Sequence, residues 1–140
     1  MIEHIQNTYQ SINADSLKAG ILRELYTEDA EFIDPFHHMQ GLPTLEAYFT
    51  RLYRNVRKIE FSYGDAVSEG SHIFMAWSMT VEHPRLKNGR PVQVEGTTHF
   101  ITRDGLVCLH RDYFDAGEML YENLPLIGRL VNAIKQRMGQ

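Results

Sequence analysis

Apolar positions recur at helical spacing in the first part of the chain. Ile2, Ile5 and Tyr9 follow one another at intervals of three or four residues, which predicts an amphipathic helix over residues 2–12. Residues 13–16 interrupt the pattern, and we expect Asp15 or Ser16 to cap a second helix, because their side-chain oxygens can accept hydrogen bonds from free backbone N–H groups. The buried stripe of this helix consists of Leu17, Ile21, Leu22 and Leu25, and residues 27–30 form its exit turn.

A short extended segment and a third helix come next. Residues 31–36 predict a short or edge strand, because Pro35 lacks the N–H that a central strand would need. The sequence Gly41-Leu42-Pro43 opens a third helix, since proline is suited to the first helical turn. The apolar face of this helix continues through Leu45, Phe49, Leu52 and Tyr53.

The hydrophobic period changes to two from about residue 59. This alternation predicts strands at residues 59–65, 71–82, 90–102 and 106–114. Asn88-Gly89 and Asp104-Gly105 mark hairpin turns between them, because glycine tolerates the positive φ that a tight turn requires. Helices that precede a run of strands indicate an α+β fold, with the helices packed on one face of a curved antiparallel sheet.

The C-terminal segment has a separate amphipathic pattern. We expect a domain over residues 1–118 and an amphipathic helix within residues 119–140, packed on the same domain or on a dimer partner. Its apolar stripe comprises Leu126, Ile127, Leu130, Val131, Ile134 and Met138, opposite Arg129, Lys135 and Arg137. An anionic membrane surface is the alternative, but one short stripe and three cations give weak membrane affinity, so docking on protein is favoured.

Length, charge and cysteine content narrow the function classes. A chain of 140 residues fits one domain. Its 14 basic and 18 acidic residues give a net charge of −4 without a basic block, which argues against a nucleic-acid partner. The single Cys108 excludes an internal disulfide, and the start of the chain lacks a signal-peptide pattern, so we expect a cytoplasmic protein.

The strand predicted at residues 106–114 carries polar groups on one face. Alternation places Cys108, His110, Asp112 and Phe114 on the same side. A carboxylate in the middle of an apolar strand needs hydrogen-bond partners or a wet cavity. This strand is therefore the first place to look for chemistry.

Two segments of the chain resemble a known superfamily. Residues 25–36, with Gly41 after them, are similar to the segment that precedes the third helix in nuclear-transport-factor-2-like (NTF2-like) proteins, and residues 110–115 resemble the last strand of limonene epoxide hydrolases. The resemblance covers roughly residues 2–118 and points to the SnoaL-like branch. It implies a cone-shaped curved sheet with three N-terminal helices, here followed by an extra C-terminal helix. This fold hosts isomerases, cyclases, hydrolases and proteins without catalytic activity.

The resemblance also assigns expected roles to individual residues. Asp34 matches the general base of ketosteroid isomerases, while Tyr9 lies near their oxyanion-hole tyrosine and Thr98 stands where they have a protonated aspartic acid. Asp112 matches one of the two catalytic aspartates of the epoxide hydrolases. Trp77 and Met79 occupy the positions of the bridging arginine and the other aspartate, so the hydrolase triad is absent.

Strand parity gathers these residues around one predicted pocket. We expect the catalytic residues to be Asp34, Asp112 and Tyr9, and the substrate-binding residues to be Trp77, Met79, Thr98, His110, Phe114 and Phe36. Burial disfavours the charged form of a carboxylate and so raises its pKa towards neutrality, where the group can exchange a proton with a substrate. In the alternative interpretation, Asp34 caps the turn at Pro35, and Asp112 is tied by a hydrogen bond or an arginine.

Three functional hypotheses follow from this pattern. The first is a cofactor-independent acid/base enzyme acting on a small hydrophobic substrate. The second is a non-catalytic module that binds a hydrophobic ligand, and the third is a structural dimer subunit. We expect no metal, because the seven histidines include no His-x-x-x-His pair and no cysteine partner pattern.

We also expect a homodimer. The outward-facing positions of the predicted strands are too apolar for a face left in water. They comprise Phe74, Ala76, Thr97, Ile101, Leu109 and Tyr113.

Overall fold

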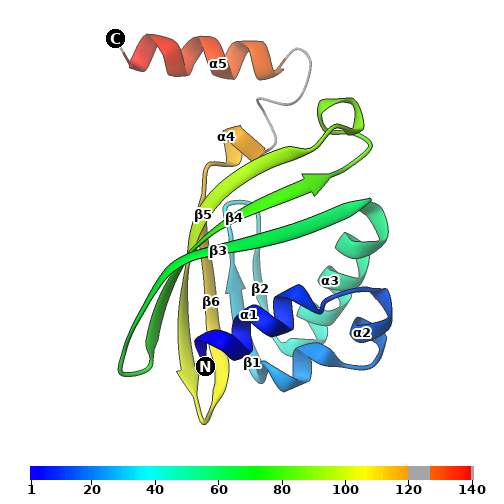
Figure 1. The fold of residues 1–140 in the computed structure, drawn as a ribbon, viewed down its shortest axis with the longest axis vertical. Coiled ribbons are helices and arrows are strands. Elements are labelled where there is room, and N and C mark those ends of the chain that lie inside the picture. The colour runs from blue at the N-terminus through cyan, green and yellow to red at the C-terminus, as the bar shows by residue number, and fades with distance from the viewer. Residues whose placement is uncertain (120–126, 140) are drawn as a thin grey trace.

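The computed structural model describes residues 1–119 and 127–139. The helical elements are α1 (Ile2–Gln10), α2 (Ala14–Lys18), η1 (Ile21–Glu24), α3 (Leu42–Asn55), η2 (Lys87–Gly89), α4 (Ala116–Met119) and α5 (Ile127–Met138). The strands are β1 (Tyr26–Ile33), β2 (His38–Gln40), β3 (Lys58–Glu69), β4 (His72–Glu82), β5 (Val92–Arg103) and β6 (Leu106–Phe114). They form a six-stranded sheet, in the order β2-β1-β6-β5-β4-β3, that curves around α1, α2 and α3 (Figure 1).

The later strands form the predicted antiparallel meander. β3, β4, β5 and β6 pair in sequence, and the turn between β5 and β6 has positive φ at both Asp104 (53°) and Gly105 (80°), as a tight hairpin requires. The sheet departs from a purely antiparallel arrangement at β1, which pairs in parallel with β6. This pair sets Phe32 beside His110 and Ile33 beside Arg111, so Asp34 leaves β1 next to the Asp112 position of β6.

The second predicted helix is the clearest local error. Asn13, and not Asp15 or Ser16, caps α2: its Oδ1 accepts hydrogen bonds from the backbone N–H groups of Asp15 and Ser16, both at 2.9 Å. The helix stops because Gly20 adopts a left-handed φ of 85°, and a short 3-10 turn, η1, follows it. The predicted exit turn at residues 27–30 belongs to β1 instead.

The core lies between the helices and the concave face of the sheet. One cluster packs α1, η1 and α3 against the strands, and its fully buried members include Ile5, Leu25 and Leu45. A second cluster gathers around Trp77. Each large apolar side chain buried in this way contributes about 1.5–3 kcal/mol, so the packing fixes the inner face on which the polar site lies.

The C-terminal helix α5 lies beyond the end of the sheet, next to α4 (Figure 1). Lys135 on α5 forms an ion pair with Asp115, and a Cβ at Gly117 would lie 3.5 Å from Val131. Four residues of its predicted apolar stripe, Ile127, Leu130, Ile134 and Met138, are 48–84% exposed. Leu126 lies outside the described residues. Packing of this stripe on a partner subunit remains a prediction.

No helix among the described residues has both the length and the hydropathy needed to cross a membrane.

Candidate functional site

A cavity of about 110 Å³ lies between the helices and the inner face of the sheet. Its lining is predominantly aromatic and aliphatic, with a few polar groups. The lining includes eight of the nine predicted site residues: Tyr9, Asp34, Trp77, Met79, Thr98, His110, Asp112 and Phe114. The ninth, Phe36, lies outside the lining because it sits on the turn after β1, where it is 36% exposed and its ring centroid is 6.0 Å from that of Phe114.

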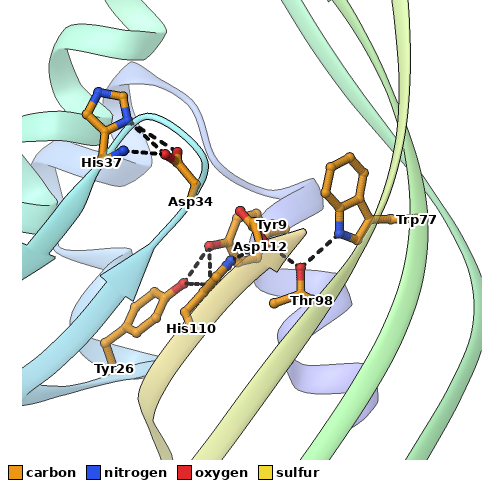
Figure 2. A network of polar contacts seen from close by, with 8 residues as sticks. All are labelled: Tyr9, Tyr26, Asp34, His37, Trp77, Thr98, His110 and Asp112. Atoms are coloured by element: carbon orange, nitrogen blue, oxygen red, sulfur yellow. Dashed lines mark hydrogen bonds and ion pairs between the residues drawn. The ribbon is translucent and has the colours of Figure 1, made fainter. Parts of the chain in front are cut away.

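A first chain of hydrogen bonds reaches Asp112 from β4 and β5. The indole Nε1–H of Trp77 donates to Thr98 Oγ1 at 2.8 Å, and the Thr98 hydroxyl donates to Asp112 Oδ1 (Figure 2). Thr98 and Asp112 are register partners on β5 and β6, so the sheet itself holds them face to face. The direction of this chain is fixed, because an indole can only donate and a carboxylate can only accept.

A second chain reaches the same carboxylate oxygen through His110. Nε2 of the imidazole lies 2.8 Å from Asp112 Oδ1, and Nδ1 lies 2.7 Å from the Tyr26 hydroxyl. Tyr9 Oη is 2.5 Å from Tyr26 Oη. If Nε2 donates to Asp112, Nδ1 is an acceptor: it takes a proton either from Tyr26 at 2.7 Å, with Tyr9 donating to Tyr26, or from Tyr9 at 3.2 Å, with Tyr26 donating to Tyr9. In both arrangements, the Tyr9 proton is used within this network and not at a substrate.

The two chains leave one Asp112 oxygen available. Oδ1 accepts from both Thr98 and His110, whereas Oδ2 has no hydrogen-bond partner among the described residues. The Asp112 side chain is 16% exposed, and no Lys or Arg of the described residues forms an ion pair with it. Such a carboxylate is oriented by its partners and retains an oxygen able to accept a proton.

Asp34 is held by entirely local bonds. Its Oδ1 accepts from the backbone N–H groups of Phe36 and His37, both at 2.7 Å, and His37 Nδ1 lies 3.1 and 3.2 Å from its two oxygens. Figure 2 shows this pair apart from the Asp112 network. The two alternatives drawn from the sequence therefore coexist, because Asp34 both caps the turn at Pro35 and contributes to the cavity wall.

The tyrosines around the cavity remain protonated at neutral pH. Burial raises the pKa of the Tyr9 and Tyr26 hydroxyls well above the usual value. Burial also raises the pKa of Tyr48, with the negative charges of Asp34 and Asp112 as further causes. Tyr48 is thus a neutral hydroxyl in the wall of the cavity that both carboxylates line.

Sequence reasoning missed three tyrosines of the site. Tyr48 and Tyr63 line the cavity, and Tyr26 belongs to the His110 chain. Tyr63 has the parity of Ile59 and Phe61 within the predicted strand, which was a usable signal. Tyr26 had none, because the residues around it predicted the end of a helix.

Two exposed histidines are paired with carboxylates. His37 pairs with Asp34, and His38 pairs with Glu31 at 3.0 Å. Within residues 1–119 and 127–139, no three His, Cys, Asp or Glu side chains are grouped as metal ligands.

Comparisons with known proteins agree with this architecture. A protein from Jannaschia sp. CCS1 described as a SnoaL-like polyketide cyclase is 19% identical, with 81% of this chain and 84% of that chain covered and a TM-score of 0.66. An LEH-like epoxide hydrolase from M. tuberculosis is 18% identical, with coverages of 96% and 95% and a TM-score of 0.71. An NTF2-like protein of unknown function from Burkholderia pseudomallei K96243 is 16% identical, with coverages of 85% and 93% and a TM-score of 0.72.

At these identities the likeness establishes the fold alone. Curated protein sequences give no match. The family model for the SnoaL-like domain matches residues 5–110. The chain therefore belongs to the SnoaL-like domain family and has the NTF2-like fold.

Proposed function

We propose that the protein is a cofactor-independent acid/base enzyme of the isomerase or cyclase type, acting on a small hydrophobic carbonyl compound. One observation carries the proposal: the Asp112 carboxylate lines an apolar cavity with one oxygen held by two donors and the other without a partner among the described residues. A general base needs an acceptor oxygen at the substrate and a fixed orientation. Asp112 meets both conditions.

The proposed step is the transfer of a proton from carbon. Asp112 Oδ2 takes a proton from the carbon next to the substrate carbonyl, the C–H electron pair moves into a new C=C bond, and the carbonyl oxygen becomes an enolate. The same carboxyl group then returns the proton to a different carbon of a conjugated enolate, or the enolate carbon attacks a second carbonyl carbon of the same molecule, whose C=O π pair moves onto oxygen and takes the proton from Asp112. Thr98 and His110 hold Oδ1 throughout.

The lining disfavours the hydrolase alternative. Trp77 and Met79, neither of which can ionise at neutral pH, stand at the positions expected for the bridging arginine and the second aspartate of the epoxide hydrolases. The neighbour described as a polyketide cyclase supports cyclisation as one member of the proposed class.

The cavity limits the size of the substrate. An apolar cavity of about 150 Å³ holds benzene, and pockets for drug-sized ligands measure about 300–1,000 Å³. The volume here, about 110 Å³, is smaller than both, so the cavity suits the reactive end of a molecule whose remainder extends outside it.

Hydrogen–deuterium exchange at carbon tests the proposal without knowledge of the natural substrate. Acetophenone, 1-indanone and 1-tetralone in D₂O are followed by proton NMR with and without the protein. We expect faster loss of the α-proton signal with the wild type, and a decrease in this rate of about 10²–10⁴-fold in Asp112→Asn. Asp34→Asn is the matched control.

Equal exchange rates in the wild type and Asp112→Asn would overturn the assignment of Asp112. Binding of the ketones without any exchange would support the alternative, a ligand-binding module.

We also propose that the protein forms a homodimer through the outer face of the sheet. Phe74 and Tyr113 are 44% and 50% exposed there, and the His99 ring stacks on Phe74 with centroids 4.3 Å apart. Light scattering at micromolar concentration should give twice the chain mass for the wild type and a lower mass for Phe74→Asp. A monomeric wild type would contradict the proposal.

A further inference from the structure

The hydroxyl group of Tyr63 is buried without a hydrogen-bond partner among the described residues. Tyr63 lies on β3 and lines the same cavity as Asp112. The other buried side-chain atom in this condition, Thr27 Oγ1, belongs to a residue outside the lining. Since a buried hydroxyl without a partner carries the full cost of its lost hydration, native proteins rarely retain one without a reason.

The strands fix the direction of the Tyr63 side chain. Tyr63 is the register partner of Trp77, so the two side chains lie on the same, inner face of the sheet. Its ring stacks on Phe61 with centroids 6.2 Å apart and an interplanar angle of 8°. The register shifts immediately afterwards, between Tyr63 and Ala66, and such bulges often set the direction of a side chain beside a functional site.

Most other polar groups of the wall already have partners. The Trp77 N–H is used by Thr98, the Thr98 hydroxyl by Asp112, and the hydroxyls of Tyr9 and Tyr26 take part in the His110 chain. Tyr63 differs from them because its hydroxyl is buried and unpartnered. Burial raises the pKa of this hydroxyl, so at neutral pH it is a neutral donor.

We propose that Tyr63 is a substrate-binding residue whose hydroxyl donates a hydrogen bond to a ligand oxygen. This inference rests on the proposed function in taking the cavity as the ligand site. The ligand class is then a compact apolar molecule with one acceptor oxygen, such as a ketone, ester or ether, that reaches Tyr63 while its reactive carbon faces Asp112. Hydrocarbons of the same shape fill the cavity but leave the hydroxyl unpaired.

The position of Tyr63 relative to Asp112 supports this assignment. Its register partner, Trp77, begins the hydrogen-bonded chain that passes through Thr98 to Asp112. Tyr63, His110 and Asp112 line the same cavity. A ligand oxygen bound at Tyr63 would therefore lie in the cavity that contains the carboxylate, and a neutral donor placed there stabilises a developing negative charge.

The test compares Tyr63→Phe with the wild type in two independent measurements. The first is the melting temperature of the free protein. Because the substitution removes only the unpaired hydroxyl, we expect an unchanged or higher melting temperature, by up to about 4 °C. A clear decrease would show that the hydroxyl is already satisfied in the free protein and would overturn the proposal.

The second measurement is the affinity for a matched pair of probes, acetophenone and ethylbenzene. The carbonyl group of acetophenone is replaced by a methylene group in ethylbenzene. In NMR titrations, Tyr63→Phe should bind acetophenone about 3- to 10-fold more weakly and ethylbenzene equally well. Tyr113→Phe, at the exposed outer face, should change neither affinity. If Tyr63→Phe keeps the wild-type ratio of the two affinities, the proposal is wrong.

These outcomes are separate from those of the proton-transfer test. Failure of Asp112→Asn to slow exchange would remove the catalytic role while leaving the ketone preference at Tyr63 intact. If Tyr63→Phe shows that Tyr63 does not provide the preference for the ketone, the role of Asp112 is unaffected.

Discussion

Two carboxylates line the cavity, one on β6 and one directly after the parallel strand β1, yet their surroundings differ. Asp34 is bonded within its own turn, to the backbone of Phe36 and to His37. Asp112 is bonded to Thr98, 14 positions earlier, and to His110, which in turn contacts tyrosines 84 and 101 positions before it. A carboxylate that satisfies a turn has a local structural role, whereas one oriented from several elements depends on the whole fold. Of the two, Asp112 is the better candidate for chemistry.

The largest expected effect comes from Gly96, which supports the Asp112 side of the cavity. A Cβ there would lie 2.4 and 2.6 Å from the Trp77 ring and 2.8 Å from the Tyr113 carbonyl oxygen. Gly96→Ala should therefore displace Trp77 from Thr98 and reduce the free energy of unfolding by about 3 kcal/mol. Urea denaturation and the emission of Trp77, the single tryptophan of the chain, measure both effects.

Gly64→Ala is the matched control on the same sheet. Its added Cβ would lie 3.5 Å from the Ala76 Cβ, an ordinary contact. Equal destabilisation by the two substitutions would mean that the contact between Gly96 and Trp77 has no special importance.

A smaller effect is expected from Thr98→Val, which keeps the shape of the side chain and removes its hydroxyl. The buried Trp77 N–H then has no acceptor, and Asp112 Oδ1 loses one of its two donors. We expect a decrease in the free energy of unfolding of about 2 kcal/mol, together with slower α-proton exchange. Thr97→Val, at the neighbouring outward position, should be close to neutral in both measurements, and a similar loss in both variants would contradict the network.

The smallest effect is expected on the Asp34 side. Asp34→Asn keeps an oxygen for the two backbone N–H groups and removes only the carboxylate charge facing His37; the Asp34 side chain is 6% exposed, but that of His37 is 41% exposed, so solvent screens the pair on one side. Such partly exposed pairs contribute about 0–1 kcal/mol. Thermal denaturation should therefore change little, and proton exchange should stay within about tenfold of the wild type. A loss as large as that of Asp112→Asn would make Asp34 a second catalytic residue.

The sequence predicted those parts of the site that depend on local periodicity. Strand alternation placed Thr98, His110 and Asp112 on the inner face, and Asp34 before Pro35 indicated its turn. The second helix, predicted to continue through Leu25, ends at Lys18, because Gly20 adopts a left-handed conformation that apolar spacing does not reveal. The chain from Tyr9 through Tyr26 to His110 could not be predicted, because it depends on the parallel pairing of β1 with β6.

The ring tautomer of His110 tests the central claim most directly, since the orientation of Asp112 depends on it. Nitrogen-15 NMR of selectively labelled histidine distinguishes the two ring nitrogens. At neutral pH the account predicts a protonated Nε2, facing Asp112 Oδ1 at 2.8 Å, and an unprotonated Nδ1, accepting from Tyr26 at 2.7 Å. A proton on Nδ1 alone would place a lone pair against the carboxylate and contradict the proposed orientation of Asp112.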